Sequence, residues 1–184
     1  PLALQMFRRK LGIVFQDYKL LGNRTVAENI AFPLEVCGVP DEQIEKRVRK
    51  VLELVDLTKH AHTLPHALSG GEKARAAIGR AIVHDPIIIL ADEPTGNIDP
   101  DQSVKIMKLF KQIHDSGTTI VIATHDSGLV DALKPRVIQL VDGEIVRDST
   151  GKYQNTIKKP TATTSTKSTS KIPKRKVKVT GIGA

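Results

Sequence analysis

The chain has 184 residues, 40% of them hydrophobic, which is enough for one domain of ordinary size with a buried core. No apolar run approaches the roughly 18 residues that a membrane-spanning helix needs, and the single cysteine, Cys37, excludes an internal disulfide. The net charge of +8 does not indicate a nucleic-acid partner. Nine of the 28 Lys and Arg residues follow residue 150, which leaves 19 basic against 20 acidic residues in the predicted domain. That domain is nearly neutral, whereas a domain that binds nucleic acid normally presents a basic face.

The first predicted elements are a short helix, a strand and a longer helix. Residues 1–10 are expected to form the short helix, and the apolar segment Leu11–Phe15 the strand. Thr25 offers a side-chain cap for the longer helix. That helix is expected to run to about Ala31, because Pro33 cannot donate the backbone hydrogen bond that would continue it.

The next predicted helix begins after Pro40, with Asp41 as its cap, and extends to about Val55. Its apolar residues recur at helical spacing, at Ile44, Val48, Val51, Leu52 and Val55. Such a stripe is typical of a helix that packs on its own core.

Ser69-Gly70-Gly71-Glu72 has the spacing of a capping box, in which the serine hydroxyl and the glutamate carboxylate bond each other's backbone amides. A helix is therefore expected from Gly70 to about His84. The two glycines leave its first turn uncovered by side chains, so the amides at the positive end of the helix dipole can approach an anion such as phosphate. An ordinary helix N-terminus after a loop is the alternative interpretation of these four residues alone.

Two apolar segments are each followed by polar residues that can do chemistry. Ile87–Ala91 is a continuous run typical of a parallel strand buried on both faces, and Asp92 and Glu93 follow it. Thr118–Thr124 predicts a second such strand, with His125 after it. Open α/β sheets bind ligands at the carboxyl ends of their strands. There one carboxylate can hold Mg²⁺, its neighbour can orient or deprotonate a water, and a histidine can donate to a developing phosphate charge. A solvated turn and a structural histidine are the alternatives for each segment taken singly.

The remaining predicted elements are a helix before the Thr118–Thr124 strand and a hairpin after it. Asp99-Pro100 gives a cap and a first-turn proline for a helix to about His114. Asp142-Gly143 between two apolar segments, Arg136–Val141 and Glu144–Asp148, is a strong signal for a two-residue hairpin turn. We expect this hairpin to form an edge of the sheet and to take no part in chemistry.

The composition changes after residue 150, so residues 1–150 are predicted to form the folded domain and residues 151–184 a basic disordered tail. The tail is rich in Lys, Thr, Ser and Pro and contains no acidic residue. An anionic membrane surface could attract it, and a merely solvated tail is the alternative.

Four motifs stand in one order along the chain: VFQD at 14–17, LSGGE at 68–72, LADEPTGNID at 90–99 and ATHD at 123–126. Their order and separations resemble an ATP-binding cassette (ABC) ATPase subunit, most closely of the cell-division branch, over about residues 4–153. The resemblance implies an α/β fold with a P-loop NTPase-like core and a mostly parallel sheet. It also implies an inserted helical subdomain, at about residues 22–84, that faces a membrane subunit.

The cofactors and catalytic roles follow from the same resemblance. It implies that ATP and Mg²⁺ bind where two cassettes close head to tail. Gln16 and Asp92 would hold Mg²⁺, Glu93 would polarise the attacking water, and His125 would steady the γ-phosphate.

The second subunit of such a homodimer would complete each ATP site. It would contribute Ser69, Gly70 and Gly71 to the nucleotide, and the loop ending at Asp99 would cross the dimer interface. Closure would pass through the Gln16 region to a membrane subunit that regulates cell-wall hydrolysis at division. The chain would therefore lie peripherally on the cytoplasmic face of the plasma membrane.

The motif G-x-x-x-x-G-K-[ST] does not occur in the 184 residues. In the resembled family this Walker A loop lies upstream of the Gln16 motif, and its lysine holds the nucleotide phosphates. We therefore expect an ATPase domain that is N-terminally truncated, lacks its phosphate-loop segment and is inactive alone.

Three alternatives stay open. The first is the ATPase of a lipoprotein-release or macrolide-type exporter, since those branches share LADEPTGN. The second is a non-catalytic, partner-binding fragment. The third is a nucleic-acid or scaffolding protein with a cassette head, although such proteins carry long heptad coiled coils and this sequence has none.

Overall fold

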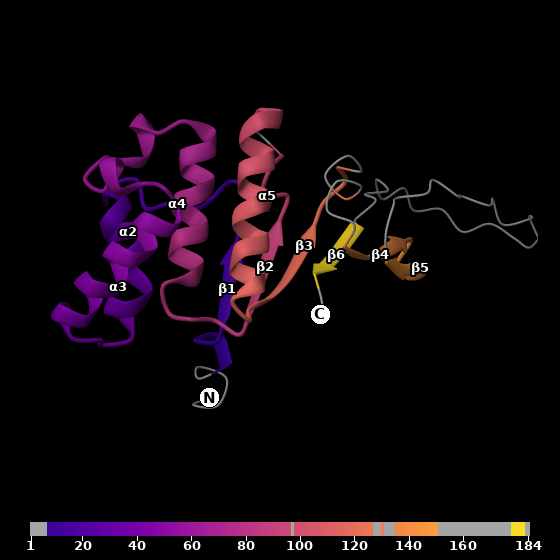
Figure 1. Ribbon diagram of the computed structural model, residues 1–184, viewed down its shortest axis with the longest axis horizontal. Coiled ribbons are helices and arrows are strands. Elements are labelled where there is room, and N and C mark those ends of the chain that lie inside the picture. The colour runs from indigo at the N-terminus through magenta and orange to yellow at the C-terminus, as the bar shows by residue number, and fades with distance from the viewer. Residues whose placement is uncertain (1–6, 97, 127–129, 131–134, 151–177, 183–184) are drawn as a thin grey trace, which may run out of the picture.

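Six strands form one sheet in the order β1-β2-β3-β6-β4-β5 (Figure 1). The computed structural model describes residues 7–96, 98–126, 130, 135–150 and 178–182. Three strands are parallel: β1 (Leu11–Val14), β2 (Ile88–Asp92) and β3 (Thr119–Ala123). The other three extend the sheet with antiparallel pairing: β6 (Lys178–Ile182), β4 (Arg136–Val141) and β5 (Glu144–Thr150).

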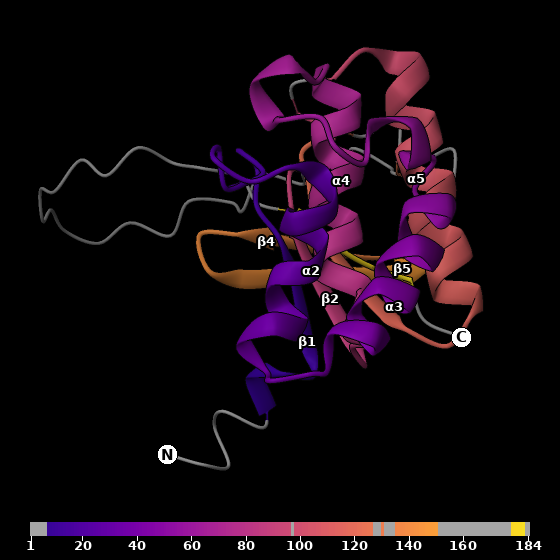
Figure 2. The ribbon, with the colours of Figure 1, turned by 90° about the vertical axis from the view of Figure 1, so that its left-hand side faces the viewer.

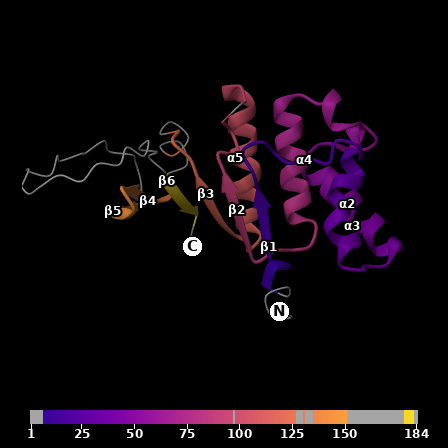
Figure 3. The same ribbon diagram turned by 180° about the vertical axis from the view of Figure 1, so that it is seen from behind.

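The helices lie on one face of the parallel strands, as Figure 1 and the reverse view in Figure 3 show. α4 contacts β1 and α5 contacts β3, while α2 and α3 pack on α4 farther from the sheet (Figure 2). Their bounds are Val26–Val36 for α2, Asp41–Leu54 for α3, Gly70–Ile82 for α4 and Pro100–Asp115 for α5, with short 3-10 turns at Thr58–His60 and Pro65–Ala67.

The parallel strands are buried on the helical face only. Val14 and Ile89 are fully buried, and a Cβ atom at Gly12 would lie 2.5 Å from the backbone oxygen of Ala81 in α4. On the opposite face Ile13 is 43% exposed and Leu90 39% exposed. The prediction that the strand after Pro86 is buried on both faces is therefore wrong for the part of the chain that the structure describes, because helices cover one face there.

Two helix boundaries differ from the prediction. Thr25 does cap α2, through a capping box with Glu28, but the helix continues past Pro33 to Val36. The interior proline removes one backbone hydrogen bond, and the burial of Leu34 on the core side of α2 offsets that cost. Asp41 is the first residue of α3 and not its cap, since no side chain caps that helix.

The other predicted helices and the hairpin are confirmed. Ser69 caps α4 and Asp99 caps α5, each through its side chain. Asp142 and Gly143 both have positive φ, 51° and 86°, which the tight turn between β4 and β5 requires. β5 lies at the edge of the sheet, as expected.

The predicted disordered tail needs one correction. Lys178–Ile182 forms β6, which pairs with both β3 and β4. The segment contains β-branched residues that favour strands, and the edge of β3 offers it backbone partners. Residues 151–177, like most of the short helix predicted over residues 1–10, lie outside the described residues. Among the described helices, none combines the length and the apolar character that crossing a membrane requires.

A buried asparagine fastens the segment after β1 to α2. The Asn29 side chain is inaccessible to solvent. Its Oδ1 accepts from the Leu21 amide at 2.7 Å, and its Nδ2 donates to the carbonyl oxygens of Leu21, Arg24 and Thr25 at 2.9–3.1 Å. This single side chain therefore bonds the Leu21 amide and the Arg24 carbonyl, which no helix or strand pairs. It also adds a bond to the Leu21 and Thr25 carbonyls, which already accept from backbone amides.

Asn29→Ala should lower the free energy of unfolding by about 3 kcal/mol, because several backbone groups lose their hydrogen-bond partner at a buried position. The matched control is Asn23→Ala, at an exposed position of the same segment, which should change stability by less than about 0.5 kcal/mol. Urea unfolding of both variants measures the difference. An equal loss of unfolding free energy in the two variants would show that the hydrogen bonds of the buried Asn29 side chain add nothing to stability.

Stability should also fall as pH drops below about 6.5, the ordinary pKa of histidine, through His84. Burial lowers the pKa of His84, although its bond to the Leu11 carbonyl and nearby Asp85 act in the opposite direction. The folded state therefore resists protonation that the unfolded chain accepts, so stability is greatest above the unfolded pKa and is lost as pH falls. Denaturation measured at pH 7.5 and 5.0 should show a smaller loss for His84→Gln than for wild type. His66→Gln, at an exposed histidine, should keep the wild-type loss, and an unchanged loss in His84→Gln would contradict the assignment.

Candidate functional site

The carboxyl ends of β1, β2 and β3 bring four of the predicted site residues to one edge of the sheet (Figure 1). Val14 pairs with Ala91, and Asp92 pairs with Ala123. Gln16 follows β1, Asp92 is the last residue of β2 with Glu93 directly after it, and His125 follows β3. The parallel register alone therefore gathers residues that are more than 100 positions apart in the sequence.

Glu93 is the best-held side chain of this edge. Its Oε1 accepts from the His125 amide at 3.0 Å and lies 2.6 Å from His125 Nδ1. Its Oε2 accepts from the Thr124 hydroxyl at 3.2 Å. The Glu93 side chain is only 18% exposed, whereas that of His125 is 73% exposed. The carboxylate is thus fixed in orientation, and the outer part of the imidazole remains accessible from solvent.

The backbone of Glu93 is also special. Its φ of 45° lies in the left-handed region, which residues other than glycine rarely adopt. Its amide donates to the Ala123 carbonyl at 2.8 Å, and its carbonyl accepts from Gly96 at 3.0 Å. These bonds compensate for the conformation, which turns the chain sharply away from the sheet. Strain of this kind persists where the surroundings over-determine it, and it is concentrated at functional sites.

Gln16 approaches the same turn from β1. A Cβ atom placed on Gly96 would lie 3.5 Å from Cβ of Glu93 and 3.9 Å from Nε2 of Gln16. The amide of Gln16 is therefore next to the loop that carries Glu93, although Gln16 itself is exposed.

Asp92 is exposed at the end of β2. Among the described residues, no group of three or more His, Cys, Asp and Glu side chains is arranged to hold a metal ion. The donor set at this edge is one carboxylate, Asp92, with the side chain of Gln16 following the adjacent strand β1. Such a set suits Mg²⁺, which uses one or two carboxylates together with substrate phosphates and water, and not a metal caged by protein alone.

Ser69, Gly70 and Gly71 form the first turn of α4 and lie apart from that edge. The Ser69 hydroxyl and amide both donate to Glu72 Oε2, at 2.7 and 2.8 Å. These two bonds, from the hydroxyl first and then the amide, lower the pKa of Glu72. In the part of the chain that the structure describes, the cap does not hydrogen-bond to Glu93 or His125. The structure does not bring the two halves of the predicted ATP site together within one chain.

Asp99 serves as a helix cap. Its Oδ1 accepts from the Gln102 amide at 3.0 Å, at the start of α5. The Gln102 side chain in turn lies against α4, since a Cβ atom at Gly71 would meet its Cγ and Oε1 at 3.2 Å. The loop that ends at Asp99 and the glycine turn of α4 are therefore neighbours, although Asn97 lies outside the described residues.

Sequence reasoning missed two contributors to this arrangement. Thr124 bonds Glu93, and its place in ATHD beside His125 was the available signal. Gln102 also accepts a hydrogen bond from Arg75 Nη1 at 3.2 Å. No motif marks Gln102, because its role depends on the packing of α5 against α4.

Comparison with known proteins agrees with the fold and the motifs. The family model described as ABC transporter matches residues 2–96, which is more than half of the 184 residues. The cell division ATP-binding protein FtsE of Bacillus subtilis is 53% identical over 147 residues, which are 79% of this chain and 64% of that protein. FtsE of Streptococcus pneumoniae is 52% identical over 80% of this chain and 65% of that protein.

Solved structures give the same result. The ATP-binding cassette MJ0796, in a dimeric post-hydrolysis state bound to ADP and Pi, superposes with a TM-score of 0.71 at 37% identity, over 80% of this chain and 66% of that one. The chain thus spans just under two thirds of the length of these relatives. From the family match, the identities and the shared fold, the chain belongs to the ABC transporter family.

Proposed function

We propose that this chain forms the hydrolytic side of the nucleotide site in an FtsE-type ABC ATPase. The observation that carries the proposal is the Glu93 carboxylate, held by Thr124 and His125 at the strand ends beside Asp92 and Gln16. ATP hydrolysis needs a group that orients and deprotonates water, and a carboxylate fixed at two oxygens is suited to that step.

The hydrogen bonds of Glu93 and His125 indicate the catalytic role of each side chain. Glu93 takes the proton of the attacking water as general base, since its two oxygens keep a defined orientation. His125 donates to Glu93 through Nδ1, because a carboxylate only accepts. In the imidazolium form Nε2 also carries a proton and can donate to the charge that develops on the transferred phosphoryl group. The 73% exposure of the His125 side chain is consistent with a role toward a bound substrate.

Asp92 and Gln16 would hold Mg²⁺, which when bound neutralises phosphate charge. Their oxygens fit that ion, as argued above, and need nucleotide phosphates to complete its ligands. The phosphate-loop motif does not occur in the printed sequence. The described residues would therefore supply the magnesium side and the water side of the site, while another segment cradles the phosphates.

Ser69, Gly70 and Gly71 would bind the nucleotide held by a second copy of the chain, and the loop ending at Asp99 would lie at that interface. Two observations support a head-to-tail homodimer. The helix cap of Ser69 makes no hydrogen bond to the Glu93 edge of its own chain among the described residues. The similar cassette MJ0796 was solved as a dimer.

The names of the relatives support a role in cell division. The proteins that are 53% and 52% identical are both cell division ATP-binding proteins FtsE. On this basis the chain would act with an FtsX-like membrane subunit at the cytoplasmic face of the plasma membrane. The nine basic residues after residue 150 would add attraction to anionic lipid, about 1 kcal/mol for each cation near the surface.

The proposal is tested in a chimaera in which this chain replaces the matched 147 residues of Bacillus subtilis FtsE. The chimaera should hydrolyse ATP and co-purify with an FtsX-type membrane subunit. ATP turnover without any association with that subunit would favour a different branch of the family. A folded chimaera that binds ATP and does not hydrolyse it would contradict the catalytic assignment.

Glu93→Gln in this chimaera should lower kcat by at least about 100-fold, the lower limit of what a general base contributes, and leave ATP binding intact. Glutamine keeps the size and most hydrogen bonds of the side chain but cannot take the proton. Glu144→Gln, at the exposed first residue of β5, is the control and should keep wild-type turnover. Turnover near wild type in Glu93→Gln would remove Glu93 from the proposed role.

Mixing two inactive variants tests the head-to-tail arrangement. Gly70→Asp places a carboxylate in the first turn of α4, where it suits the helix dipole but repels phosphate. A mixed dimer with Glu93→Gln has one intact site if the glycine turn serves the partner subunit. Random mixing should then restore roughly a quarter of wild-type turnover. No gain over either variant alone would show that each chain uses its own glycine turn.

A further inference from the structure

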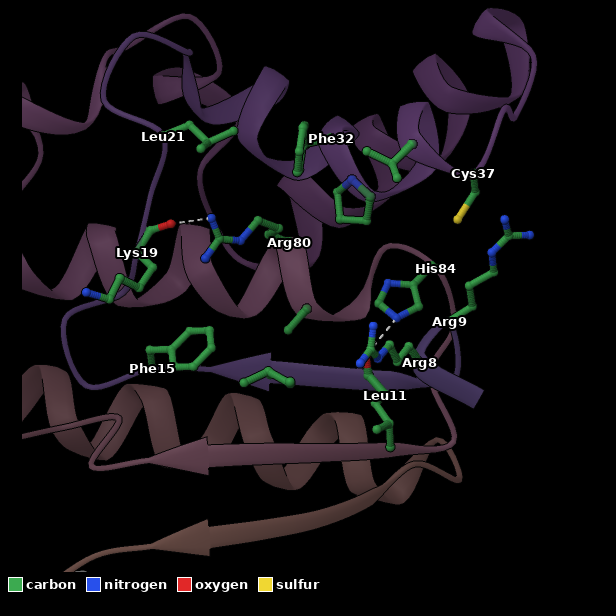
Figure 4. Close-up of a pocket in the computed structure, with 14 residues that line it drawn as sticks. Arg8, Arg9, Leu11, Phe15, Lys19, Leu21, Phe32, Cys37, Arg80 and His84 are labelled. Carbon is green, nitrogen blue, oxygen red and sulfur yellow. Dashed lines mark hydrogen bonds between the residues drawn. The ribbon is translucent and has the colours of Figure 1, made fainter. Parts of the chain in front are cut away.

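Arg80 in α4 grips the loop that follows Gln16. Its Nη2 donates to the Tyr18 carbonyl at 2.7 Å, and its Nη1 donates to the Lys19 carbonyl at 2.6 Å. Figure 4 shows the guanidinium pointing at Lys19 from across the groove beside β1. Burial lowers the pKa of Arg80, so the protein accepts a desolvation cost to place this cation against two successive backbone oxygens.

The two residues that Arg80 grips have a strained backbone. Tyr18 has φ of 61° and Lys19 has φ of 45°. Residues other than glycine rarely adopt this left-handed backbone conformation, and two such residues in succession are rarer still. A loop in this conformation needs outside contacts that compensate for it. The two charged hydrogen bonds from Arg80 are directed at the carbonyls of these two residues.

Other contacts hold the loop less firmly at this point. The Tyr18 ring is buried, but its hydroxyl has no hydrogen-bond partner among the described residues. Lys19 pairs with Asp17 within the loop itself, and both side chains are more than half exposed, so the pair contributes little. Asn29 fastens the chain only from Leu21 onward. The Tyr18 ring packs in the core, and among the described residues the side-chain hydrogen bonds from Arg80 tie the backbone carbonyls of Tyr18 and Lys19 to the helical layer.

The same helix carries the glycine turn. Ser69 caps α4 and Arg80 lies ten residues after Gly70, which is about 15 Å along a helix. Most of the residues between them are buried, so α4 moves as one body. A shift of its N-terminal turn is then transmitted through Arg80 to Tyr18 and Lys19, and so to Gln16 two residues before them.

We propose that Arg80 is a positioning residue that couples the Gln16 loop to α4, so that Gln16 and the Ser69–Gly71 turn move together. The assignment of both segments to nucleotide sites rests on the proposed function, whereas the clamp itself rests on geometry alone. Arg80 touches no reacting group. It acts by keeping a strained loop in register with a helix whose far end would face another nucleotide.

The clamp requires the forked shape of arginine. A guanidinium can donate to two successive carbonyls at once, and a lysine ammonium at the same place keeps the charge but not this geometry. Arg80→Lys is therefore the informative change. Arg75→Lys is its matched control, because Arg75 is also a half-buried arginine of α4 but bonds Gln102 and not the loop.

Hydrogen exchange of the full 184-residue chain measures the clamp without any need for activity. In Arg80→Lys, amides of residues 17–21 should exchange roughly tenfold faster, the factor that loss of one hydrogen bond to a charged group implies. Amides of α5 should not change, and Arg75→Lys should leave the loop as in wild type. Unchanged exchange in Arg80→Lys would overturn the proposal. Should that variant fail to fold, Arg80→Gln, whose shorter amide cannot span both carbonyls, takes its place with the same expected outcome.

A rescue experiment separates positioning from general stability. Glycine adopts the backbone conformation of Lys19 without strain, so Lys19→Gly should return loop exchange in the Arg80→Lys background at least halfway to wild type. Lys19→Ala removes the same side chain without relieving the strain and should not. In the chimaera, Arg80→Lys should lower kcat roughly tenfold with little change in KM for ATP. Lys19→Gly in that background should restore part of the lost kcat. Faster loop exchange with unchanged kcat would overturn the coupling between the loop and α4. An inactive parent chimaera would instead refute the proposed function, and the exchange result alone would then test whether Arg80 holds the loop.

Discussion

Parallel pairing of β1, β2 and β3 is the constraint on which the candidate site depends. Because the three strands run in one direction and in register, the residues that follow them emerge at one edge. Glu93 then turns sharply, with a left-handed backbone held by Ala123 and Gly96, and so its carboxylate meets Thr124 and His125 from the neighbouring strand. If β2 slipped by one residue, Glu93 would point to the other face and the pair with His125 would be lost.

Local patterns were sufficient to predict the elements that build this edge. Short stretches of sequence predict where the strands near Asp92 and His125 end. They also predict the caps at Thr25, Ser69 and Asp99 and the hairpin turn at Asp142-Gly143. Each depends on a side chain that bonds its own backbone a few residues away, or on the continuity of an apolar run. The structure places these elements as predicted because such interactions need no distant partner.

The features that could not be predicted all depend on distant contacts. A proline normally ends a helix, and α2 passes Pro33 because its core side packs on α4, which the local sequence does not reveal. β6 forms because the edge of β3 offers partners far away in the sequence. Asn29 and Arg80 bind backbone carbonyls, and every residue presents a carbonyl, so residue types at their targets carry no signal. Motif matching finds Gln16 and Ser69 but not the side chain that connects them.

The physical properties of α4 explain why that connection matters. A helix whose one end is a capping box and whose middle is buried cannot bend to absorb a local shift, since its hydrogen bonds and packing resist it. The strained loop at Tyr18 and Lys19 is the opposite kind of element, because it relaxes as soon as its external bonds are lost. Arg80 connects the rigid helix α4 to the more easily displaced loop at Tyr18 and Lys19 through two hydrogen bonds. A movement of α4 must therefore be followed by the Tyr18–Lys19 loop, and a movement of the loop by α4, or those two hydrogen bonds must break.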